Sequence, residues 1–262
     1  MINRNANVTS ICQELIQAKS YSGEEEEVVK VVEKIMLAFD FDEIIKDRYG
    51  NIYGIIQGAF DGPTQLYDAH VDTVVVPDPS SWKFDPFGGE LSDGKIYGRG
   101  TSDMKGALAS MLVAARNYAD QTKKQFNGRI CVAGVVHEEC FEGVAAREIS
   151  KNLSPDYVII GEASSLNVKH GQRGRAEIVI ETFGKPAHSA NPEHGINAVY
   201  HMSTIINKVK EIPTETDENL GKGILVLTDI KSSPYPGASV VLITVEPLGI
   251  DDCLWEKQKK VS

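Results

Sequence analysis

The fold is decided by the stretch from residue 104 to residue 136, which reads MKGALASMLVAARNYADQTKKQFNGRICVAGVV. In residues 104–119, small and apolar side chains recur at helical spacing, and residues 129–136 form an apolar run of strand length. A helix that leads into such a strand is a building unit of α/β domains. We therefore expect this stretch to form a helix and a strand of one layered domain.

The segments on either side continue this alternation. The predicted strands are residues 52–56, 64–67 and 157–160, and a further predicted helix is residues 143–150. Two more helices open the chain, and the second follows a Ser22-x-x-Glu25 pattern that predicts a capping box. Alternating strands and helices predict an α/β fold with a mostly parallel sheet, in which functional residues gather at the strand ends.

The pattern changes near residues 171–174, which read GQRG. The segments that follow are a predicted strand at residues 175–182, a helix at 198–209 and a strand at 224–228. Because this order is typical of an α+β arrangement, we expect two domains, residues 1–174 and residues 175–262.

The composition is that of an ordinary globular protein. The formal net charge of −10 comes from acidic residues spread along the 262-residue chain, which disfavours nucleic acid and anionic membranes as partners. The four cysteines are scattered and form neither a paired zinc spacing nor a disulfide framework, so we expect reduced thiols. No apolar run has the length of a membrane span and no apolar signal core opens the chain, so we expect a cytoplasmic protein.

His70 and Asp72 follow the predicted strand at residues 64–67. Side chains two positions apart on a strand project to the same face. Asp72 can therefore accept the second N–H of a metal-bound His70 and fix the orientation of its ring. A surface pair on a loop is the alternative interpretation of so short a motif.

Carboxylates recur at similar places further along. Asp103 lies where the Gly-rich residues 98–106 meet a helix, a position for either an N-cap or a bridging metal ligand. Glu138 and Glu139 end an apolar strand and point to different sides, so one can bind a metal ion while the other acts as a general base. Glu162 follows the next strand. The alternative interpretation of the glutamate pair is a solvated acidic loop. The alternative interpretation of Glu162 is a residue at the N-terminus of a helix.

Taken in this order, the motifs resemble those of the co-catalytic zinc metallopeptidase family that includes acetylornithine deacetylase, succinyl-diaminopimelate desuccinylase, aminoacylases and glutamate carboxypeptidases. The resemblance extends over roughly residues 11–230. Its motifs are His70-Val71-Asp72, residues 98–106 (GRGTSDMKG), Glu138-Glu139, Gly161-Glu162 and residues 184–189 (GKPAHS). It implies an α/β catalytic domain with an inserted α+β, ferredoxin-like lid and dimerisation domain.

The resemblance also implies a pair of zinc ions and their ligands. His70 and Glu162 would bind one ion, Glu139 would bind the other, and Asp103 would bridge the two. Cobalt or manganese remains possible because the same ligand types accept several divalent ions.

Three further residues take implied catalytic roles. Asp72 would support His70, and Glu138 would be the general base that deprotonates the attacking water. His188 would reach into the active site of a partner subunit in a homodimer and stabilise the oxyanion. The other histidines have no matching role and are interpreted as ordinary surface or core residues: His137, His170, His194 and His201.

The implied reaction is hydrolysis of an N-acyl or terminal peptide bond in a small amino-acid-like substrate. Glu162 stands where relatives acting as aminopeptidases or dipeptidases tend to carry aspartate, which favours the deacylase and glutamate-carboxypeptidase branch, and within that branch we expect a deacylase. A dipeptidase or carboxypeptidase of the same family is the alternative.

The end of the chain departs from the family pattern. The resemblance implies a return to the catalytic domain with a last histidine ligand, whereas no histidine follows His201. We therefore expect a chain shortened at its C-terminal end, as a fragment or by a shifted reading frame. Two hypotheses stay open: a zinc hydrolase, or a non-catalytic remnant that binds at most one metal ion.

Overall fold

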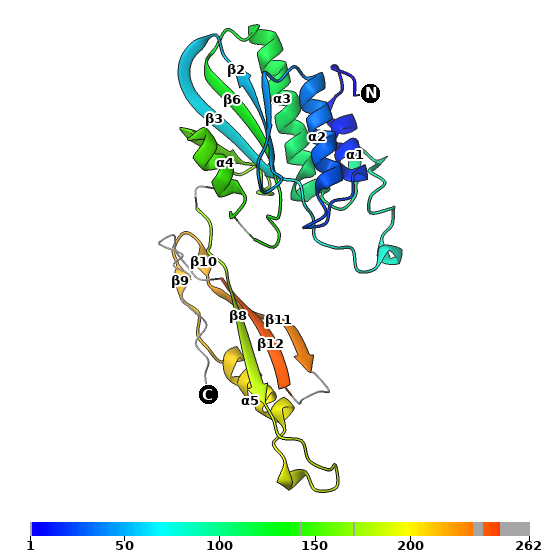
Figure 1. Ribbon diagram of the computed structural model, residues 1–262, viewed down its shortest axis with the longest axis vertical. Helices are drawn as coiled ribbons and strands as arrows, with labels where there is room; N and C mark the ends of the chain where they lie inside the picture. Colours follow the sequence, from blue (N-terminus) through cyan, green and yellow to red (C-terminus); the bar gives the residue numbers. More distant parts are fainter. Residues whose placement is uncertain (1, 142, 170, 233–237, 247–262) are drawn as a thin grey trace. The chain divides into compact units, whose positions relative to one another are not determined.

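The computed structural model describes residues 2–141, 143–169, 171–232 and 238–246 (Figure 1). The chain divides between Leu166 and Asn167 into two compact units. The interpretation of two domains that part after residue 174, a catalytic domain and a lid, stays a prediction.

The first unit contains a five-stranded sheet in the order β1-β2-β6-β3-β7. Its strands are β1 (Glu43–Lys46), β2 (Ile52–Gln57), β3 (Phe60–His70), β6 (Asn127–Val135) and β7 (Tyr157–Ile160). β3 pairs in parallel with β6 and β7, whereas β2 pairs antiparallel with β1 and β6. Only β2 therefore runs against the others, which confirms the predicted α/β fold with a mostly parallel sheet.

Helices lie on both faces of this sheet (Figure 1). They are α1 (Val8–Gln17), α2 (Glu26–Ala38), α3 (Gly106–Thr122) and α4 (Ala146–Leu153). Gly54 of β2 leaves room for Met36 of α2 on one face, and Asn152 of α4 donates to the hydroxyl of the neighbouring Tyr53. The apolar stripes of α1, α2 and α3 form one continuous core with the central strands. Among the described residues, no helix combines the length and apolarity needed to span a bilayer.

The predicted capping box before α2 was wrong. The helix begins at Glu26 after an N-cap residue, Glu25, whose side chain makes no capping bond. The Ser22 hydroxyl donates instead to Asp72 Oδ2 at 2.6 Å. A long-range carboxylate partner has replaced the local backbone partner that the pattern predicted.

Short elements complete the first unit. They are a 3₁₀ turn (Pro79–Ser81), the hairpin strands β4 (Glu90–Ser92) and β5 (Lys95–Tyr97), and a π-type turn (Thr101–Lys105) directly before α3. This turn occupies the first residues of the predicted helix, so the α-helix itself begins only at Gly106.

The second unit has the predicted α+β order. Its antiparallel sheet runs β11-β12-β8, built from β8 (Ala176–Phe183), β11 (Ile224–Ser232) and β12 (Ala238–Glu246). The remaining elements are a 3₁₀ turn (Pro192–His194), α5 (Ala198–Lys210), β9 (Thr216–Asp217) and β10 (Gly221–Lys222). Met202 of α5 is buried against Ile180 and Leu225. Residues 247–262, the end of the predicted second domain, lie outside the described residues.

Candidate metal centre

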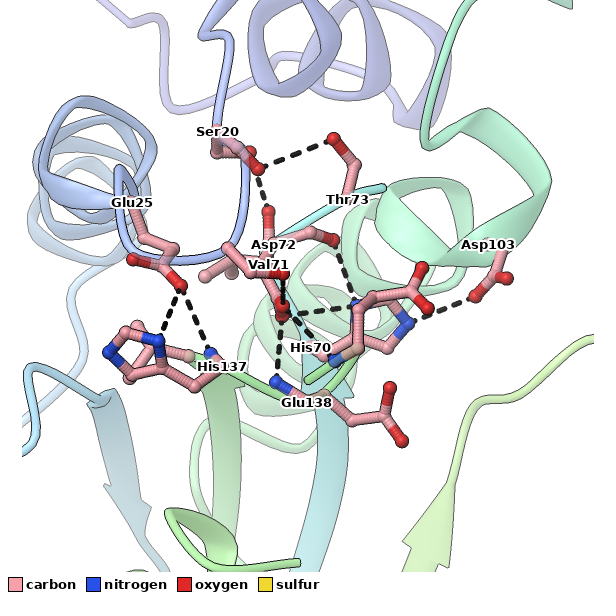
Figure 2. Close-up of polar contacts among 12 residues, drawn as sticks. Ser20, Glu25, His70, Val71, Asp72, Thr73, Asp103, His137 and Glu138 are labelled. Carbon is pink, nitrogen blue, oxygen red and sulfur yellow. Dashed lines mark hydrogen bonds and ion pairs between the residues drawn. The ribbon is translucent and has the colours of Figure 1, made fainter. Parts of the chain in front are cut away.

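His70 is the last residue of β3 and only 2% of it is exposed. Its Nδ1 donates to the Asp72 carbonyl oxygen at 2.9 Å and lies 3.5 Å from Asp72 Oδ1. Its Nε2 lies 2.9 Å from Asp103 Oδ1 (Figure 2). The same atom lies 3.6 Å from Glu162 Oε1. Because the Nδ1 proton is directed to Asp72, Nε2 is the ring atom that faces the carboxylates and can coordinate a metal ion.

Charge around His70 favours a cation at this position. Burial lowers the pKa of His70, but hydrogen bonds to Asp72 and Asp103 and the charges of Glu138 and Glu162 outweigh burial and raise the pKa to about 10. The surrounding carboxylates therefore stabilise positive charge here.

Asp72 is fully buried and connects His70 to the glutamate pair. Its Oδ1 accepts from Glu138 N and its Oδ2 from Glu139 N, both at 3.1 Å, in addition to the Ser22 hydroxyl. Burial raises the pKa of Asp72. These hydrogen bonds and the one to His70 together lower the pKa by more than burial raises it, so the net shift is downward. Asp72 is thus an ionised anchor beneath the site. The sequence predicted its contact with His70 and missed its contacts with the backbone of the pair.

Asp103 reaches the site from the turn before α3. The turn follows Gly100, which has a φ of 85°, and the Lys105 N–H donates to the Gly100 carbonyl oxygen at 2.7 Å. The buried Lys105 Nζ also donates to the carbonyl oxygens of Leu15 and Ala18 at 2.9 Å, which fastens the turn to the end of α1. The Gly-rich sequence therefore supplies the unusual backbone that aims Asp103 at His70.

The remaining carboxylates come from the ends of the strands next to β3. Glu138 and Glu139 follow β6, and Glu162 follows β7. Because β3, β6 and β7 are parallel neighbours, their carboxyl ends meet at one edge. Burial and the nearby carboxylates raise the pKa of Glu139 and of Glu162.

Within the part of the chain that the structure describes, two groups of side chains could each hold a metal ion. One is His70, Glu138 and Glu162, and the other is His70, Asp103 and Glu139; within each group the ligand atoms lie within 4.8 Å of one another. One imidazole with carboxylates fits divalent ions such as zinc, cobalt or manganese. The structure thus brings the four predicted ligands together, although these groups divide them differently from the predicted pairing and include Glu138.

His188 belongs to the second unit, in the loop after β8. It is exposed, and its Nδ1 accepts from Ala190 N at 3.1 Å. Its predicted role across a subunit boundary stays a prediction.

Comparisons with known proteins find a matching family model and several relatives. The model of "Peptidase family M20/M25/M40" matches residues 66–229. The uncharacterized protein YgeY of Escherichia coli K12 is 34% identical over 230 residues, which cover 86% of this chain and 56% of YgeY. A succinyl-diaminopimelate desuccinylase of Wigglesworthia glossinidia brevipalpis is 31% identical over 213 residues, which cover 78% of this chain and 56% of that enzyme. The chain thus spans little more than half the length of these relatives.

A solved structure shares the fold. The M20 family metallo-carboxypeptidase Sso-CP2 of Sulfolobus solfataricus aligns with a TM-score of 0.71, covering 94% of this chain and 72% of that chain. At 16% sequence identity, this likeness shows the fold alone.

Proposed function

Because this chain belongs to peptidase family M20/M25/M40, we propose that it hydrolyses an amide bond in a small acylated amino acid or peptide. The observation that carries the proposal is the meeting of four carboxylate side chains around one buried histidine, at the carboxyl edge of three parallel strands. The family supports a metal-dependent hydrolase. Zinc is the proposed metal, since imidazole and carboxylates are its common ligands in catalytic sites.

His70, Asp103, Glu139 and Glu162 would hold the metal. Bound there, a divalent ion supplies Lewis acidity toward the amide carbonyl and toward water. The protein's own contribution is orientation, because Asp72 fixes the His70 ring and the backbone of the glutamate pair. Preorganised ligands of this kind need little rearrangement during the reaction.

Glu138 is the proposed general base. Its carboxylate would accept a proton from the attacking water and return it to the departing amine as the C–N bond breaks, which leaves a carboxylic acid and an amine as products. The 3.1 Å bond from Glu138 N to Asp72 Oδ1 supports this role, because it anchors the backbone that carries the base.

The proposed substrates are N-acyl amino acids. The similarity to a succinyl-diaminopimelate desuccinylase supports this choice over a peptide. We further propose a homodimer through the second unit, with His188 acting in the partner's site. The exposed free thiol of Cys140 supports a reducing compartment such as the cytoplasm.

A substrate panel tests the proposed function. The purified chain would be loaded with zinc, cobalt or manganese and assayed on N-acetyl and N-succinyl amino acids and on dipeptides. We expect hydrolysis of an N-acyl substrate that a chelator abolishes. Metal-independent turnover, or turnover of dipeptides alone, would contradict the proposal.

A further inference from the structure

Three consecutive backbone N–H groups, those of residues 137 to 139, point at two buried carboxylates. His137 N donates to Glu25 Oε1 and Glu138 N donates to Asp72 Oδ1, each at 3.1 Å (Figure 2). Glu139 N donates to Asp72 Oδ2, also at 3.1 Å. Successive amide donors of this kind form a concave anion-binding surface, called a nest. Here the anions that the nest binds are carboxylates of the same chain, those of Glu25 and Asp72.

The backbone conformation of this nest needs support. His137 has a φ of 59°, in the left-handed region that non-glycine residues rarely adopt. Such a conformation persists when surrounding contacts hold it. β6 ends at Val135, and Val136 N then donates to Asn51 Oδ1 at 3.0 Å. The bond that holds His137 itself is the one from its N–H to Glu25.

Glu25 makes three contacts through a single oxygen atom. Besides His137 N, its Oε1 accepts from Gly23 N at 2.9 Å and lies 3.4 Å from His137 Nδ1. The Glu25 side chain is only 6% exposed. It therefore joins the connection between α1 and α2 to the strand end that carries the glutamate pair.

The sequence around Glu25 provides an internal comparison. Glu24, Glu26 and Glu27 are exposed, whereas Glu25 is buried. The acidic run at the start of α2 has a general explanation, since negative charge is favourable at a helix N-terminus. That explanation does not account for the burial of one member against the site.

We propose that Glu25 is a positioning residue for Glu138 and Glu139. By holding His137 in its left-handed conformation, it sets the direction in which the two following carboxylates leave the end of β6. Glu25 itself touches neither metal nor substrate. The expected effect of Glu25 on metal binding rests on the proposed metal site. The hydrogen bond between Glu25 and the nest does not depend on that site.

Four variants test the proposal. Glu25→Ala removes the acceptor, and Glu25→Asp keeps the charge but is too short to reach His137 N. Glu25→Gln keeps an Oε1 acceptor without the charge, and Glu24→Ala is the exposed control. The first measurement is hydrogen exchange of the His137 amide by NMR without metal. The second is cobalt affinity by titration, since supporting residues behind metal ligands commonly contribute about 10–100-fold.

We expect Glu25→Ala and Glu25→Asp to speed exchange of the His137 amide by about tenfold or more and to weaken cobalt binding by about tenfold or more. Glu25→Gln should stay within about threefold of the unaltered chain in both measurements, because it retains the acceptor. Glu24→Ala should change neither. If Glu25→Ala does not fold, the comparison of Glu25→Asp with Glu25→Gln decides.

Unchanged exchange and unchanged affinity in Glu25→Asp would overturn the proposal. A loss of affinity in Glu25→Gln equal to that in Glu25→Asp would also overturn it, since charge and not the hydrogen bond would then be responsible. If the unaltered chain binds no cobalt, the proposed metal site fails, and the exchange measurement still tests the link between Glu25 and the nest.

Discussion

Ser22 Oγ and Asp72 Oδ2 are 2.6 Å apart and 50 residues apart in the sequence. The Ser22 hydroxyl is one of the donors that let a fully buried Asp72 remain ionised. A buried carboxylate that loses a hydrogen bond becomes costly, because it has no water to replace the lost donor. This single contact therefore affects both the stability of the first unit and the anchor beneath the proposed metal site.

Replacement of Ser22 by alanine should lower the free energy of unfolding by about 1–3 kcal/mol, the usual cost of leaving a buried hydrogen-bond acceptor without its donor. Ser110→Ala is the matched control, because this exposed hydroxyl bonds only to a carbonyl oxygen of its own helix. The control should stay within about 0.5 kcal/mol. Urea unfolding followed by circular dichroism measures both, and equal midpoints for the two variants would contradict the prediction.

The pH dependence of stability should carry a contribution from Cys131. Burial raises the pKa of this fully buried thiol to about 11, from an ordinary value of 9.0. The unfolded chain therefore loses the thiol proton first, so the contribution of Cys131 is complete below pH 9 and disappears as pH rises toward 11.

The test compares the chain with its Cys131→Ala variant at each pH. Between pH 9 and 11, the unaltered chain should lose about 1–3 kcal/mol of unfolding free energy relative to the variant. Urea unfolding in a pH series measures the difference. Parallel pH profiles for the two proteins would show that the thiol does not titrate as expected.

The extent to which this site could be predicted depends on how local its determinants are. His70 and Asp72 follow from the alternation of side chains along a strand, and their meeting with Glu138 and Glu162 follows from the shared edge of parallel strands. The same reasoning predicted the α/β sheet, because its strands carry apolar runs with helices between them. The antiparallel direction of β2 had no such signal.

Ser22 and Glu25 were beyond this reasoning. Their spacing predicted a capping box. In the structure, Ser22 bonds to Asp72, 50 residues away, and Glu25 bonds to His137, 112 residues away. Contacts over such separations depend on how the finished fold packs, and no pattern within a short window encodes them. The left-handed backbone conformation at residue 137 could not be predicted either, because the residue there is a histidine and not a glycine.

Edge strand β7 should promote association of the purified chain. Its residues Tyr157 to Ile160 are apolar or aromatic, with exposed fractions of 44–63%. An edge strand offers unpaired backbone groups to other chains, and exposed apolar side chains beside those groups favour such pairing. Val158→Lys should therefore reduce concentration-dependent association in sedimentation velocity. Leu37→Lys is the control, since Leu37 is equally apolar, is 63% exposed and lies on a helix; an equal reduction by both variants would contradict a specific role of the edge.

Metal content should be limited by the single imidazole. Both candidate groups among the described residues share His70, and carboxylates without an imidazole hold zinc weakly. We expect about one tightly bound zinc ion per chain after dialysis, its loss in His70→Ala, and no change in His201→Ala, whose imidazole is exposed on α5. Two retained ions per chain, measured by plasma emission spectrometry, would mean that another ligand completes the second site.

The roles of the two adjacent glutamates can be separated by measuring metal content and turnover together. Glu138 lies close enough to His70 and Glu162 to be a ligand, and Glu139 lies equally close to His70 and Asp103. Geometry alone therefore permits either residue to bind metal. In the proposed division of roles, Glu139 is a metal ligand and Glu138 is the general base.

If that division is right, Glu138→Ala should reduce turnover of the best substrate in the panel by about 10²–10⁴-fold, because a general base contributes this much. Its zinc content should stay near that of the unaltered chain, since Glu138 is not needed as a ligand. Glu139→Ala should instead lose zinc affinity along with any turnover. Both bonds to Asp72 are made by backbone N–H groups, so neither substitution removes a donor and we expect the same backbone frame in both variants. Loss of zinc in Glu138→Ala with retention in Glu139→Ala would reverse the assignment and make Glu139 the base.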